Sequence, residues 1–214
     1  MPKPLIPMNE QDRGLIALVQ AIVARDARKV ASLLARSPAL ATSAFAVGAT
    51  RASAAPYYVT AIEAYICEGD TALHVAAAAY DKAAIRVLVA RGANVAAKNR
   101  LGGEPLHAAA HGGPTFHTWN PRAQEATVLA LVEAGADPNS VDKRGVAPLH
   151  VAVRTRCTGA VRALLASGAN PRKKNGSGST PMDLATSTTG RGGTGTPAAK
   201  KEQAAIVRLL NGQS

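Results

Sequence analysis

The segment TALHVA at residues 71–76 recurs three times farther along the chain. It returns as EPLHAA at 104–109, as APLHVA at 147–152 and as TPMDLA at 180–185. The four copies begin 33, 43 and 33 residues apart, so the middle interval contains ten extra residues. Self-similarity at a period of this size is typical of repeat architectures, in which each unit is one supersecondary element.

A second apolar pattern follows each copy of that segment. Three apolar residues are spaced i, i+3 and i+4, which places them on one face of a helix. The four trios are Ile85, Leu88 and Val89; Val128, Leu131 and Val132; Val161, Leu164 and Leu165; and Ile206, Leu209 and Leu210. Each unit is therefore expected to contain two helices.

Proline and glycine mark the ends of these expected helices. Proline opens three of the first helices, where its missing N–H costs nothing, at 105, 148 and 181. Glycine follows three of the second helices, where a left-handed residue ends the helix, at 92, 135 and 168. The same spacing of apolar residues extends upstream, because Leu18 and Val30 are separated as Leu73 and Ile85 are.

This pattern resembles the ankyrin repeat family, whose 33-residue unit carries T-P-L-H-x-A, two antiparallel helices and a projecting turn. The resemblance covers residues 10–36 and 63–212. It implies an all-α fold, an ankyrin-repeat solenoid of helix-turn-helix units with projecting finger turns. It also implies that the motif histidines are structural and bond the backbone at the junction of turn and helix.

Three motif positions depart from the family pattern. Glu104 and Ala147 replace the threonine, and Asp183 replaces the histidine. We expect these three sites to lose some of the local hydrogen bonding that the motif provides.

The resemblance predicts a single domain over residues 1–214, because one such unit cannot bury its apolar face without a neighbour. The expected units are an N-terminal cap at 10–40, repeats at 63–98, 99–141 and 142–174, and a C-terminal cap at 175–214. Insertions interrupt the register at 41–62, 112–122 and 187–199. The first insertion follows a second helix, where a finger projects, and the other two separate the helices of their units.

Cations gather in three successive turns between repeats. These finger cations are Lys98 and Arg100; Lys143 and Arg144; and Arg172, Lys173 and Lys174. Because repeats stack side by side, the turns are expected to line up in a row that attracts an acidic surface. The alternative is that charged turns serve only solubility.

Five of the seven residues of the aromatic types Phe, Tyr and Trp lie in the first two insertions. Aromatic side chains are enriched in the energetic centres of protein interfaces, and loops on a rigid scaffold commonly carry function. We therefore expect Tyr57, Tyr58 and Trp119 to contact a partner. The alternative is that they fasten their own loops to the stack, which we expect of Phe45.

No constellation in the sequence indicates catalysis, a metal or a cofactor. The motif histidines recur one repeat apart, too far to converge on one ion. His107 and His111 are four residues apart, but no HExxH glutamate accompanies them. Gly190 to Gly195 satisfy GxGxxG, yet no strand precedes them, so a basic linker is the better interpretation.

Composition defines the class of partner. The chain has 25 basic and 14 acidic residues and a formal charge of +11. We expect a monomeric, non-enzymatic scaffold that binds an acidic protein through its fingers and concave face, with nucleic acid or another polyanion as the alternative. Neither a signal peptide nor a run of about 18 apolar residues is visible, so we expect a cytoplasmic protein without a membrane span.

Overall fold

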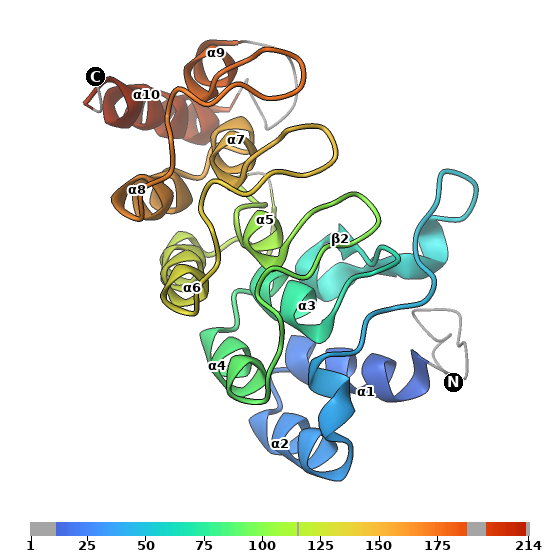
Figure 1. The fold of residues 1–214 in the computed structure, drawn as a ribbon. Helices are drawn as coiled ribbons and strands as arrows, with labels where there is room; N and C mark the ends of the chain where they lie inside the picture. The colour runs from blue at the N-terminus through green and yellow to red at the C-terminus, as the bar shows by residue number, and fades with distance from the viewer. Residues whose placement is uncertain (1–11, 115, 188–195, 213–214) are drawn as a thin grey trace.

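The computed structural model of the chain describes residues 12–114, 116–187 and 196–212. Within these residues the α-helices come in pairs along the chain, and each pair consists of a first and a second helix (Figure 1). The first helices are α1 (Arg13–Val23), α3 (Ala72–Ala78), α5 (Pro105–Ala109), α7 (Pro148–Arg154) and α9 (Pro181–Thr186). The second helices are α2 (Ala27–Arg36), α4 (Lys82–Ala90), α6 (Pro121–Glu133), α8 (Thr158–Ala166) and α10 (Pro197–Asn211).

The helices form two curved layers (Figure 1). Each first helix packs against the next first helix, from α1 to α9, and each second helix packs against the next, from α2 to α10. The finger turns project from one side of the stack, and the second helices form the opposite side. The expected all-α solenoid of helix-turn-helix units is confirmed.

Leucines at equivalent positions form a continuous core through both layers. Each is at most 1% exposed; they are Leu18, Leu73, Leu106 and Leu149 in the first helices and Leu34, Leu88, Leu131 and Leu164 in the second. Full burial of one such side chain stabilises the fold by about 1.5–3 kcal/mol. The 33-residue period therefore reflects the repeated burial of one side chain in each helix.

Each motif histidine joins its own helix to the next turn. On its own helix, Nδ1 accepts a hydrogen bond from a main-chain N–H, namely that of Thr71 (3.1 Å), Glu104 (3.2 Å) or Ala147 (3.2 Å). Since Nδ1 is an acceptor, Nε2 carries the proton and donates to a carbonyl of the following turn. The donor–acceptor pairs are His74 to Gly103 (3.1 Å), His107 to Val146 (3.0 Å) and His150 to Lys173 (3.0 Å).

The expected loss of local bonding at Asp183 is wrong. Its Oδ2 accepts from the N–H (2.8 Å) and the hydroxyl (2.7 Å) of Thr180, and that hydroxyl accepts from the Asp183 N–H (3.2 Å). A short carboxylate thus reproduces the contact of Nδ1 with the start of the helix. It cannot reproduce the second contact, because it has no counterpart of the Nε2–H that reaches the next turn.

The first insertion is more ordered than a projecting finger. Its residues form the 3-10 turns η3 (Ala55–Tyr57) and η4 (Thr60–Ile62) and the strand β1 (Tyr58–Val59). The 3-10 turn η2 (Pro38–Ala41) leads into it, and β1 pairs with the antiparallel strand β2 (Ala64–Tyr65) just after it. Phe45 fastens this segment, since its side chain is 2% exposed and its main chain bonds to Gly69 and Asp70. The η2 turn contacts α1 and α3, and the segment that follows it lies on the side of the finger turns (Figure 1).

The third insertion lies mostly outside the described residues. Residues 190–195, with their GxGxxG pattern, belong to that part of the chain. The described portion begins again at Thr196, which precedes α10.

Candidate interaction surface

Three successive finger turns are connected by main-chain hydrogen bonds. The donor and acceptor pairs are Arg100 N–H to Glu68 O (2.7 Å), Lys143 N–H to Leu101 O (3.0 Å) and Gly176 N–H to Arg144 O (2.8 Å). Gly145 has a φ of 69°, and a Cβ there would lie 2.8 Å from the nitrogen of Gly176, so the close approach requires glycine. The turns therefore form a fixed row (Figure 1).

Two of the seven finger cations serve contacts inside the protein. Lys98 lies 3.8 Å from the carboxylate of Glu104, whose side chain is 5% exposed, and so offsets a buried negative charge. Arg100 donates from Nη2 to the carbonyl of Ala49 (2.8 Å), which ties the first insertion to the finger row. These two side chains are less available to a partner than their sequence positions indicate.

The other five finger cations are free for a partner. We call Lys143, Arg144, Arg172, Lys173 and Lys174 the basic ridge. Lys173 is half-buried and the rest are exposed. Among the described residues, their side chains make neither a hydrogen bond nor an ion pair. Five cations with a fixed main chain thus lie on two adjacent turns.

The structure corrects the expectation for Tyr57. Its side chain is 9% exposed and belongs to the hydrophobic core, so it is a packing residue. Its neighbour Tyr58 is half-buried and packs on Tyr65, with ring centroids 5.0 Å apart. Tyr65, which is 50% exposed, offers the accessible aromatic surface of this segment.

Trp119 fastens the second insertion to its own repeat. Its Nε1–H donates to Oε1 of Gln124 (2.9 Å), a buried side chain that in turn donates to the carbonyl of Ala109 (3.0 Å). The indole is half-buried. Its hydrogen-bonding group is therefore already used, and only part of the ring can contact another molecule.

A groove of about 480 Å³ lies on the inner side of the stack. Its floor is formed by α3, α5 and α7, and its walls by the bases of the fingers, the β1–β2 hairpin and the second insertion. Tyr65, Leu101 and Phe116 line it, and so do His111 and Arg154. None of these five residues was singled out as a partner contact from the sequence.

The two walls contributed by the insertions are joined by one carboxylate. Glu63 Oε2 accepts from the N–H (3.0 Å) and from the hydroxyl (2.9 Å) of Thr118. These hydrogen bonds lower the pKa of Glu63, with the main-chain bond as the largest cause. We call this contact the Glu63–Thr118 clamp. The two residues are 55 positions apart, and no sequence pattern connects them.

The motif histidines and the buried cysteine have structural partners. Burial is the main cause that lowers the pKa of His107 and His150, which favours the neutral rings that the junctions require. Burial raises the pKa of Cys157 to about 11, and its Sγ donates to the carbonyl of Gly112 (2.8 Å). A protonated, buried thiol is a poor nucleophile.

Two negative findings concern only the described part of the chain. No group of three or more His, Cys, Asp or Glu residues there could hold a metal ion. None of the helices described is long and apolar enough to cross a membrane.

Two family models, both described as ankyrin repeats in many copies, match this chain. One matches residues 73–118, from α3 to the second insertion, and the other matches residues 131–185, from the end of α6 into α9. These matches agree with the resemblance inferred from the 33-residue motif. A search of curated proteins finds no match.

Proposed function

Because the chain belongs to the ankyrin repeat family, we propose that it is a non-enzymatic scaffold whose basic ridge binds a protein partner with an acidic surface. Ankyrin repeats generally mediate protein–protein interaction. The observation that carries the proposal is the row of fingers held by main-chain hydrogen bonds. A partner meets these cations on a backbone already ordered, which reduces the entropic cost of binding.

The ridge contributes mainly to the rate and orientation of binding. An exposed ion pair is worth only about 0.2–1 kcal/mol, because water and salt screen it. Complementary charge nevertheless steers the encounter and disfavours partners of the wrong sign. The proposed interface extends from the ridge to Lys98 and Arg100 on the preceding finger, and to Tyr58 and Trp119 in the insertions.

A polyanion such as nucleic acid is the second candidate, and the same five cations support it. Nucleic-acid-binding surfaces usually combine cations with aromatic side chains that stack on bases or with a recognition motif. No aromatic residue stands among the cations of the two ridge turns. We therefore favour a protein partner.

The proposal also includes that the protein is a monomer in the cytoplasm. A reducing environment suits the free thiols of Cys67 and Cys157.

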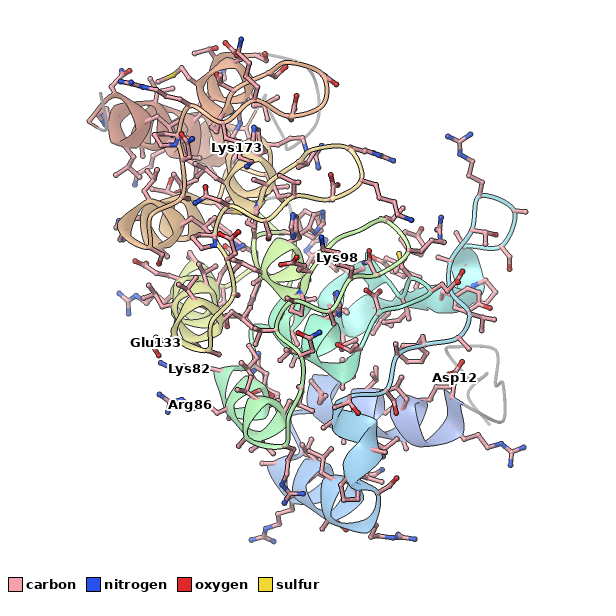
Figure 2. The ribbon with its side chains drawn as sticks, viewed as in Figure 1. Asp12, Lys82, Arg86, Lys98, Glu133 and Lys173 are labelled. Carbon is pink, nitrogen blue, oxygen red and sulfur yellow. The ribbon has the colours of Figure 1, made fainter. Side chains whose placement is uncertain are left out.

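The test compares two variants that remove the same charge from different faces. The ridge variant carries Arg172→Ala, Lys173→Ala and Lys174→Ala. Its matched control carries Arg28→Ala, Lys29→Ala and Arg86→Ala, three exposed cations of the second-helix layer. Figure 2 shows Arg86 projecting from α4 away from the finger turns. Wild type and both variants are used as baits in native lysate, with and without nuclease.

We expect one or more proteins to remain on wild type and on the control after nuclease treatment, and to be lost from the ridge variant. Equal loss from both variants would show that net charge alone retains the material. Retention that disappears with nuclease would replace this proposal with the polyanion alternative, whose affinity would fall steeply with salt.

A further inference from the structure

We propose that the groove between the β1–β2 hairpin and α5 binds an extended segment of the partner, with one bulky apolar side chain at Tyr65 and Leu101 and one carboxylate at Arg154. This inference rests on the proposed function and adds the chemistry of the ligand. Because the exposed ion pairs of the ridge contribute little to affinity, a tight complex needs an additional anchor of this kind.

The groove presents apolar surface to solvent. Among the described residues, only four large hydrophobic side chains are exposed: Val47, Tyr65, Leu101 and Leu129. Tyr65 comes from the hairpin (50% exposed) and Leu101 from a finger (41% exposed), yet both line the same groove with Phe116. Large apolar surface that converges in one concave site from separate segments is typical of a binding site.

Most polar groups that line the groove already have hydrogen-bond or ion-pair partners. His74 and His107 donate to finger carbonyls, and Asp70 accepts from the Cys67 N–H (2.6 Å) and from Asn99 Nδ2 (2.9 Å). The remaining carboxylates are held in the same way: Glu63 by Thr118, Glu104 by Lys98, and Asp142 by the N–H groups of Arg144 and Val146. What remains open to a ligand is mostly carbon surface.

One charged side chain in the groove has no partner. Of the Asp, Glu, Lys and Arg side chains that line the groove, Arg154 alone makes no hydrogen bond or ion pair within the described residues. His111 is exposed beside it, but the groove walls displace enough water to lower the pKa of its ring, and the Arg154 charge lowers it further. At neutral pH Arg154 is therefore the cation that a ligand carboxylate would meet.

The size and position of the groove indicate an extended segment. Its volume of about 480 Å³ lies within the range of sites for drug-sized ligands, which is the bulk of a few amino-acid residues. The groove also continues onto the proposed interface, because the carbonyl of Leu101 accepts from the N–H of Lys143 in the basic ridge (3.0 Å). One acidic segment could occupy the groove and continue along the ridge.

The experiment selects ligands from random nonapeptides displayed on phage, with the full wild-type chain as the target. The enriched peptides are then synthesised with a fluorescent label, and their affinities are measured by anisotropy. Three variants are compared: Leu101→Ser in the groove, Arg154→Gln at its charged end, and Leu129→Ser as the matched control. Leu129 is an exposed leucine (37%) on α6 that does not line the groove.

We expect the enriched peptides to share a bulky apolar residue with an Asp or Glu within a few positions. Because truncation of a buried interface anchor weakens binding strongly, Leu101→Ser should weaken binding about tenfold and Arg154→Gln about fivefold. Leu129→Ser should leave the affinity unchanged. Enriched peptides should also displace the partner retained on the ridge.

Two outcomes would overturn the inference. One is that no peptide is enriched, and the other is that the enriched peptides bind Leu101→Ser and Leu129→Ser equally well. Either result would leave the ridge proposal standing if a protein is still lost from the ridge variant. Failure of the ridge test with groove-dependent peptide binding would instead identify the groove as the principal site.

Discussion

Two kinds of contact connect distant parts of the chain, and they differ in how far they are buried. One is the junction at which a motif histidine links its helix to the next turn, and the other is the Glu63–Thr118 clamp. At each junction a buried histidine makes two hydrogen bonds, as His107 does with Glu104 and Val146. At the clamp, Glu63 and Thr118 meet in a contact that water can reach. The first connection recurs along the stack, and the second occurs once.

Burial decides how much each connection stabilises the protein. A buried donor or acceptor that loses its partner costs about 1–3 kcal/mol, because water cannot replace that partner. An exposed group that loses its partner turns to water at little cost. The comparison indicates that the junctions stabilise the stack as a whole, whereas the clamp positions two loops around the groove.

The largest expected effect comes from breaking a junction. His107→Ala removes the acceptor for the Glu104 N–H and the donor to the Val146 carbonyl, at a site that is 8% exposed. We expect the free energy of unfolding to fall by about 2–4 kcal/mol. Urea denaturation followed by circular dichroism measures this as a lower midpoint.

The matched substitution for that measurement is Asp183→Ala. Asp183 makes the local contact with Thr180 but has no contact that corresponds to the histidine Nε2–H. We expect a much smaller shift of the midpoint than for His107→Ala. Equal shifts would show that the local bond, and not the link between repeats, is the stabilising element.

A smaller effect should follow from acidification. The pKa values of His107, His111 and His150 are lowered in the folded chain, and the main cause in each case is loss of water around the ring. The unfolded chain therefore binds more protons than the folded chain as the pH falls below about 6.5, so stability is full above that pH and decreases below it. Burial raises the pKa of Asp70, which acts in the opposite sense at lower pH.

Thermal unfolding between pH 7.5 and 5.5 tests the sign. We expect the Tm to fall on acidification, and to fall less for His111→Gln, which removes one of the three titrating rings. The His111 ring packs edge-on against Phe116, with centroids 5.2 Å apart, and makes no hydrogen bond within the described residues. Glutamine keeps a side chain of similar reach at this position and removes the titrating group. A Tm that rises as the pH falls would contradict the assignment of neutral histidines.

The repeats could be predicted from the sequence because their pattern is local and recurs. The spacing of Leu73, Leu106 and Leu149 depends on one helix face that each repeat must bury. The finger cations were also predictable, since a turn between stacked helices has few ways to hide a charge. The sequence could not show which of these cations have partners within the protein. Lys98 lies near the buried carboxylate of Glu104, and Arg100 donates to a carbonyl far away in the sequence.

The insertions could not be predicted in the same way. Tyr57 ends the 3-10 turn η3 and Tyr58 begins β1, so the geometry of this turn decides which of the two side chains is buried. The sequence of the first insertion has no periodic pattern that fixes this choice. The groove escaped prediction for a related reason, since Tyr65, Leu101 and Phe116 converge only after three separate segments have folded.

The smallest expected effect comes from opening the clamp. Glu63→Ala removes the acceptor of both Thr118 hydrogen bonds, while Glu68→Ala removes an exposed carboxylate of the same segment that makes neither a hydrogen bond nor an ion pair among the described residues. We expect neither change to move the urea midpoint measurably. Hydrogen exchange should distinguish them, because the Thr118 amide loses its acceptor only in Glu63→Ala. The Ile66 amide bonds to the Tyr57 carbonyl across the hairpin (2.9 Å), and it should exchange faster if the clamp holds the hairpin. Unchanged exchange at Ile66 would show that core packing alone positions that wall of the groove.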